Sequence, residues 1–143
     1  MTSQNLWGEL QLVALAQPVT ILRQQATKLG ELTKNILTGE VRQLVSGASS
    51  FLLYALEVVA PAVGGYRHRV LAIQYALLTP YPLLITGAGN RRPVQCETEE
   101  EFIQNLASIL QSDDIQQPIR TLLTLSLQAE QPADTVPKAD TST

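Results

Sequence analysis

The chain has few of the residues on which common catalytic and metal sites depend. Its 143 residues include one cysteine, Cys96, and one histidine, His68. A single thiol cannot form an internal disulfide, and these two side chains are too few for a structural zinc site. A lone cysteine also fits a reducing compartment. We therefore expect a protein without disulfide, metal or cofactor.

Charged and aromatic residues are also scarce. Charged residues make up 16% of the chain and aromatic residues 5%, and the net charge is −3. We therefore do not expect the chain to bind nucleic acid through general electrostatic attraction. Residues 1–70 carry six basic and four acidic side chains, a charge of +2, so the remaining residues carry −5. This division of charge suits a protein partner at least as well as RNA.

No long hydrophobic run is present. The most apolar stretch, residues 70–85, is interrupted by Gln74, Thr79, Pro80 and Pro82. It falls short of the roughly 20 apolar residues that a membrane-spanning helix needs. No basic segment precedes the first apolar residues, so a signal peptide is not predicted. We expect a cytoplasmic protein that does not span a membrane.

What the sequence does contain is typical of a globular domain. The hydrophobic fraction is 45% and the mean hydropathy is +0.06, values of a chain that folds around a core. We divide it into an N-terminal segment at 1–17, a domain at 18–130 and a tail at 131–143. The N-terminal segment has the spacing of a short helix or docking arm, although its alternation also fits a strand. The tail lacks apolar periodicity and is predicted to be disordered.

The clearest amphipathic helix is predicted at residues 18–37. Its apolar stripe runs from Leu22 to Ile36, and Pro18 suits the first turn of a helix. Gly39 lies just beyond the predicted end, where glycine is a common stop signal.

The middle of the chain predicts an antiparallel sheet. Apolar runs at 51–60 and 66–77 flank the pair Gly64-Gly65, which indicates a hairpin. A third run at 81–86 and a short edge strand at 41–46 would extend the sheet. The alternative is that residues 51–60 and 69–78 form buried helices, because short apolar runs are ambiguous by period alone.

Two helices are predicted after the sheet. Thr98 and Glu101 have the spacing of a capping box. A second cap at residues 112–114 precedes a helix that contains Pro118 and runs to about residue 128. The fold class that follows is α+β: an N-terminal amphipathic helix, an antiparallel sheet of about three to five strands, and two C-terminal helices on one face.

The glycine loop at residues 87–92 is predicted to be the turn of a hairpin between 83–86 and 93–96. It lacks the third glycine of a dinucleotide fingerprint and the Gly-Lys-Ser/Thr of a phosphate-binding loop. Two neighbouring arginines in a loop are nevertheless able to clamp a carboxylate or phosphate. The alternative function is therefore a small-anion or nucleotide sensor that uses Gly87, Gly89, Asn90, Arg91 and Arg92.

The leading functional hypothesis is a non-catalytic protein-interaction module: an adaptor, an assembly factor or an inhibitor. Leu6, Trp7 and Leu10 form an apolar cluster near the N-terminus that either packs on the core or anchors a partner. Arg67 and Arg69 share one face of a predicted strand and complete the predicted partner-binding set. No local signature supports a nucleophile pair of His68 and Cys96, so we do not expect an enzyme. Homodimerisation through a sheet edge would cover excess apolar surface.

Overall fold

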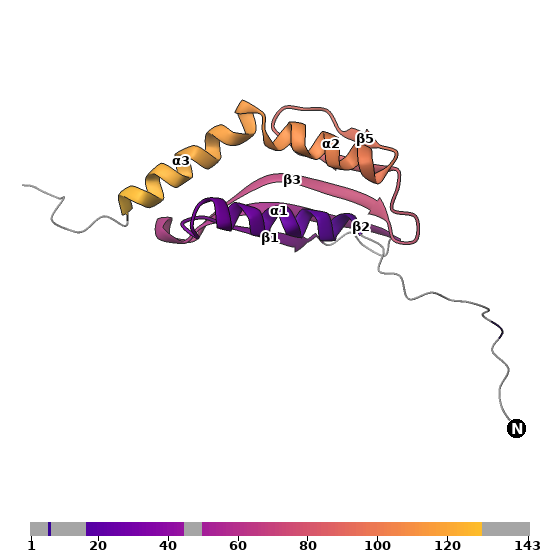
Figure 1. Cartoon of the computed structure of the whole chain (residues 1–143), viewed down its shortest axis with the longest axis horizontal. Helices are drawn as coiled ribbons and strands as arrows, with labels where there is room; N and C mark the ends of the chain where they lie inside the picture. The colour runs from indigo at the N-terminus through magenta and orange to yellow at the C-terminus, as the bar shows by residue number, and fades with distance from the viewer. Residues whose placement is uncertain (1–5, 7–16, 45–49, 130–143) are drawn as a thin grey trace, which may run out of the picture.

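The computed structural model describes Leu6, residues 17–44 and residues 50–129, and its architecture is α+β (Figure 1). Helix α1 (Pro18–Leu32) precedes a five-strand antiparallel sheet, and helices α2 (Glu99–Leu110) and α3 (Asp113–Ala129) follow it. The predicted fold class is confirmed. The strands lie side by side in sequence order: β1 (Thr38–Gln43), β2 (Phe51–Ala60), β3 (Tyr66–Ala76), β4 (Leu83–Thr86) and β5 (Val94–Cys96). A short 3-10 helix, η1 (Pro61–Val63), leads from β2 into the turn before β3.

Helix α1 begins at Pro18, as predicted, but ends at Leu32 rather than at residue 37. The Thr33 hydroxyl donates to the Leu29 carbonyl at 3.0 Å, and Asn35 enters the left-handed region at φ 64°. The Asn35 amide then donates to the Gly30 carbonyl at 2.8 Å, which closes the last turn. Apolar residues continue in the sequence beyond the end of α1 for another reason. The chain turns back there towards the core, where Leu37 is buried.

Gly39 is therefore not the stop of α1, and this prediction was wrong. It lies within β1 where the strand passes against α1, and a Cβ atom there would lie 2.5 Å from the Ala26 carbonyl oxygen. Only glycine permits this close approach of helix and strand. The edge strand also covers residues 38–43 instead of 41–46, and residues 45–49 lie outside the described part of the chain.

The central hairpin is formed by β2 and β3, as predicted, and the alternative of two buried helices is wrong. The two strands pair from Phe51 opposite Ala76 to Ala60 opposite Tyr66. The register shifts after Leu56, where β3 has one extra residue, a β-bulge. The predicted hairpin around the glycine loop is confirmed as well, since β4 pairs with β5 from Leu83 opposite Cys96.

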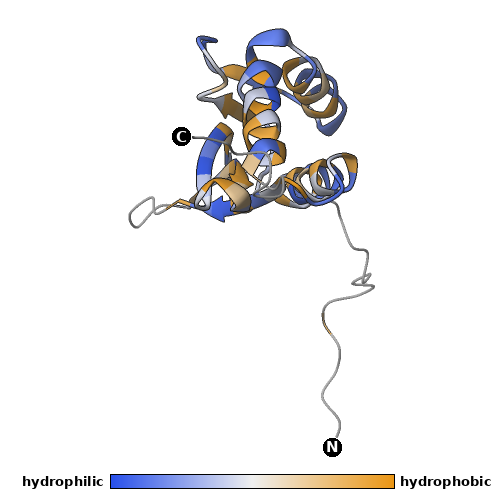
Figure 2. Cartoon of the chain, turned by 90° about the vertical axis from the view of Figure 1, so that its left-hand side faces the viewer, coloured by the Kyte–Doolittle hydropathy of each residue, from blue (hydrophilic) through white to orange (hydrophobic). Residues whose placement is uncertain are grey.

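All three helices cover the same face of the sheet. Leu56 and Val58 of β2 and Val70 of β3 belong to the main apolar core and line one cleft together with side chains of α1, α2 and α3. Figure 2 shows the division of each helix into hydrophobic and hydrophilic sectors that such packing requires. Because Glu57 lies between Leu56 and Val58, its side chain points to the other side of the sheet. We call that side the open face, because no helix of the described residues covers it.

The two C-terminal helices begin as the sequence predicts. The Glu101 amide donates to the Thr98 hydroxyl at 3.1 Å, and the Glu101 carboxylate accepts from the Glu97 amide at 2.9 Å. Pro118 lies near the start of α3. Within the described ranges, no helix is both long and apolar enough to cross a membrane.

Candidate functional site

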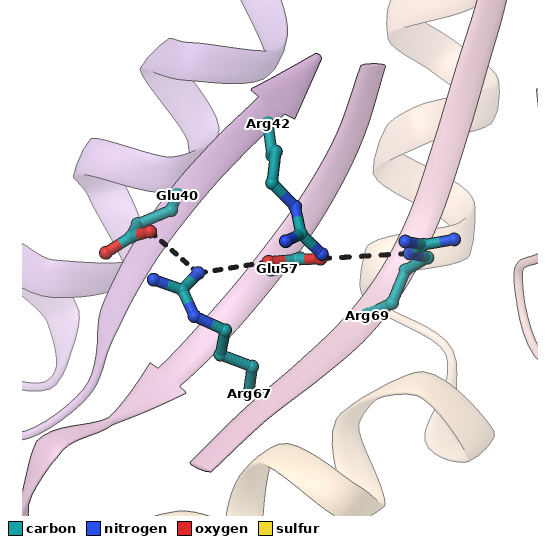
Figure 3. Close-up of polar contacts among 5 residues, drawn as sticks. All are labelled: Glu40, Arg42, Glu57, Arg67 and Arg69. Carbon is teal, nitrogen blue, oxygen red and sulfur yellow. Dashed lines mark hydrogen bonds and ion pairs between the residues drawn. The ribbon is translucent and has the colours of Figure 1, made fainter. Parts of the chain in front are cut away.

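A cluster of five charged residues, the arginine cluster, lies on the open face at β1, β2 and β3 (Figure 3). Glu57 on β2 is its centre and is only 2% exposed. Its carboxylate accepts hydrogen bonds from Arg42 Nη2 at 2.6 Å and from Arg67 Nη1 at 3.1 Å. Arg69 Nε lies 3.8 Å away, within ion-pair range but beyond hydrogen-bond length. Arg67 also donates to Glu40 at 2.8 Å.

Local geometry explains why these side chains meet. Glu40 pairs with Glu57 across β1 and β2, and Glu57 pairs with Arg69 across β2 and β3. Side chains of directly paired residues share a face of the sheet, so β2 receives arginines from both neighbouring strands. The hydrogen bond that Arg67 donates to Glu40, followed by the one that it donates to Glu57, raises the pKa of the Arg67 guanidinium. A buried carboxylate is costly unless it is paired, and these contacts provide the pairing.

The arginines hold Glu57 without being buried themselves. Their side chains are 45–55% exposed, whereas that of Glu57 is 3% exposed. Each guanidinium also carries more N–H donors than these contacts use. The cluster is thus a group of three cations gathered around one buried carboxylate, with arginine side chains that are about half-exposed to solvent.

A second feature, the apolar cleft, lies among the three helices on the covered face. It has a volume of about 380 Å³. Its apolar lining comes from both central strands and all three helices: Leu29, Leu32, Leu56, Val58, Val70, Ala107, Leu110 and Ile119. Polar side chains that line it are Gln25, Lys28, Gln111 and Gln116. Leu32 at the end of α1 is 82% exposed although it lines this cleft.

The glycine loop brings its two arginines to different environments. Gly87 and Gly89 have positive φ angles of 69° and 62°, as a tight turn requires. Arg91 donates two hydrogen bonds to the Asp114 carboxylate, at 2.7 and 3.1 Å. Arg92 is exposed. One of the two predicted anion ligands is thus already engaged by a carboxylate of α3, and the anion site stays a prediction.

His68 and Cys96 are far apart in the sheet. Cys96 pairs with Leu83, which lies level with Tyr75 on β3, because Leu84 pairs with Gln74. His68 lies earlier on β3, roughly 20 Å away along the strand. Burial raises the pKa of the Cys96 thiol, which disfavours the nucleophilic thiolate. This geometry argues against a nucleophile pair.

The predicted partner-binding residues are distributed over two regions. Arg67 and Arg69 come together in the arginine cluster, on the shared face that strand alternation predicts. Leu6 is 84% exposed, while Trp7 and Leu10 lie outside the described residues.

Sequence reasoning missed the centre of the cluster and the cleft. Glu57 is the single charge in the apolar run of β2, and a charge at that position is the signal that would have identified it. Arg42 reaches Glu57 only through the register of β1 with β2, which no local pattern encodes. The cleft depends on how three helices pack, which is also absent from any local pattern.

Comparisons of the chain with protein-family models, with curated proteins and with solved structures found no match.

Proposed function

We propose that this chain is a small cytoplasmic protein-interaction module without catalytic activity, acting as an adaptor, assembly factor or inhibitor through apolar surface. The observation that carries the proposal is the apolar cleft, with Leu32 82% exposed beside it. A large apolar side chain left in water next to an apolar cleft is typical of a surface that a partner covers.

The form of the cleft favours an amphipathic helix as the bound element. Its floor is the sheet and its walls are α1, α2 and α3. A helix placed across the cleft would bury an apolar stripe against the exposed side chain of Leu32 and keep its polar side in water, as in other helix-in-groove complexes. The Gln and Lys side chains around the cleft are suited to contact the polar flanks of such a helix.

A capture experiment with matched variants tests this proposal. The tagged full chain is purified gently from its own host, and the retained proteins are identified by mass spectrometry. Leu32→Glu places a charge at the cleft, while Leu78→Glu changes a leucine that is 91% exposed and does not line it. Because both leucines are exposed, neither variant should lose its fold, which circular dichroism would verify.

We expect one partner at near-equal stoichiometry with the wild type and with Leu78→Glu, and its loss with Leu32→Glu. Equal retention by both variants would exclude the cleft as the binding surface. A retained small molecule without a protein would contradict an interaction module altogether.

The N-terminal cluster and the sheet edges offer two further contacts for the same function. Trp7→Ala in the same capture would weaken retention if the predicted anchor of Leu6, Trp7 and Leu10 binds the partner. The described sheet ends at β1 and β5, and an edge strand is a ready template for pairing with a second copy. Sedimentation velocity would detect the homodimer predicted from the sequence.

The alternative of a small-anion sensor at residues 87–92 has less support, because Asp114 engages Arg91. It predicts that Arg92→Glu abolishes binding of a retained anion and leaves the fold intact.

A further inference from the structure

We propose that the arginine cluster on the open face binds an acidic segment of a partner protein, in which carboxylates lie close together along the chain. The bound carboxylates would contact Arg42, which Glu57 holds by a hydrogen bond, and Arg69, which the same carboxylate attracts from 3.8 Å. This surface lies on the opposite side of the sheet from the apolar cleft, so it does not depend on the function proposed for the cleft.

The local charge is the first argument for an acidic partner. Three arginines meet two glutamates, which leaves a local charge of +1 on a chain whose net charge is −3. Glu57 is buried beneath the arginines. The charge that the cluster presents to solvent is therefore more positive than its net charge of +1. An acidic segment is attracted to this patch and repelled by the remainder of the molecule, which fixes where it binds.

Preorganisation is the second argument. A free arginine loses side-chain freedom when it binds an anion, and that loss weakens binding. Here Arg42 is already held at 2.6 Å by a carboxylate that is itself nearly fully buried. The planar guanidinium can donate its free N–H groups to a second carboxylate, because its fork geometry matches a carboxylate. Glu57 therefore holds Arg42 and Arg67 in position before the partner arrives.

Arg69 is the residue most available to a ligand. Its Nε atom lies 3.8 Å from the Glu57 carboxylate, too far for a hydrogen bond, and its side chain is 47% exposed. The carboxylate attracts Arg69 without using its donors, so replacing Arg69 removes a binding group and little structural support.

Nucleic acid fits this surface less well. A phosphate backbone requires a broad positive field, whereas this chain is acidic overall and carries two carboxylates within the cluster. Tyr66, the exposed aromatic residue nearest in sequence to Arg67, lines a hollow with α3 on the covered face. It is therefore not available to stack bases beside the arginines.

Fluorescence anisotropy of a labelled decaglutamate peptide, titrated with the purified full chain at about 50 mM NaCl, tests the proposal. We expect saturable binding that weakens at high salt, and a loss of affinity of about tenfold in Arg69→Gln. Arg42→Gln should show a similar loss if it retains its fold. Arg120→Gln is the matched control, because Arg120 is also half-exposed, at 49%, and pairs with an acidic residue outside the cluster.

Several results would overturn the proposal. These are the absence of saturable binding, an equal loss in Arg120→Gln, or tighter binding of a labelled oligothymidine of the same length. Self-association that Arg69→Gln abolishes would assign the cluster to a second copy, whose exposed Glu97, Glu99 and Glu100 would be the acidic segment. Because the assay uses purified protein and does not involve the cleft, its failure leaves the function proposed for the cleft unaffected.

Discussion

Replacing Glu57 by glutamine removes the charge at the centre of the arginine cluster and keeps the shape of the side chain. The variant leaves Arg42, Arg67 and Arg69 facing one another across β2 without the carboxylate between them. The amide group of glutamine also places N–H donors against the N–H donors of the arginines. We expect this variant to fold and to be clearly less stable than the wild type.

The magnitude follows from the burial of each partner. Breaking a fully buried ion pair costs about 3–5 kcal/mol, whereas exposed pairs contribute about 0–1 kcal/mol. Here the carboxylate side chain is 3% exposed, but its arginine partners are 45–55% exposed and can return to water. The loss should therefore lie between these limits, at about 2 kcal/mol.

Thermal and urea unfolding followed by circular dichroism would measure this loss. For a chain of this length, 2 kcal/mol corresponds to a decrease in Tm of about 6–10 °C. Glu40→Gln is the matched control, because Glu40 binds the same Arg67 but its side chain is 47% exposed. It should cost less than about 1 kcal/mol. Equal losses in the two variants would refute the argument that the burial of Glu57 organises the cluster.

Three further predictions concern packing, pH and the thiol. Gly39→Ala should destabilise the fold by about 3 kcal/mol in urea unfolding, because the added Cβ would lie 2.5 Å from the Ala26 carbonyl oxygen; an unchanged midpoint would contradict this packing. The hydrogen bond that Arg91 donates lowers the pKa of Asp114 below its usual 3.8. The pair therefore stabilises the fold fully above pH 3.8, and this stabilisation is lost as the pH falls through the lowered pKa of Asp114. When the pH is lowered through this range, the free energy of unfolding should therefore fall less in Asp114→Asn than in the wild type. Parallel acid-unfolding curves of the two proteins would contradict a stabilising pair. Burial raises the pKa of Cys96, so the thiol should react slowly with a disulfide reagent at pH 8 and rapidly in urea; rapid reaction of the native protein would show an accessible thiolate.

The type and order of the elements were predictable because each depends on local chemistry. Thr98 caps α2 through a hydrogen bond between near neighbours, and the glycine loop turns because it contains two glycines at positive φ. The apolar runs and the glycine pair between them were also sufficient to place the β2–β3 hairpin. These signals lie within a few residues of one another, which is why sequence patterns recover them.

The features that were missed depend on contacts between distant residues. Helix α1 ends early because the chain buries Leu37 and needs Gly39 against the helix, and neither requirement shows in the helical period. Glu57 becomes a centre of charge only when the registers of two strand pairs bring Arg42 and Arg69 to it. Tertiary packing overrides local preference at these positions.

Site-specific photocrosslinking at position 32 in the host cell tests the central claim most directly. A photoreactive phenylalanine analogue at Leu32 lies beside the apolar cleft, and the same analogue at Leu78 serves as the control, because both leucines are more than 80% exposed. The account predicts one defined crosslinked protein from position 32 and none from position 78. The same crosslinks from both positions, or none from position 32, would contradict it.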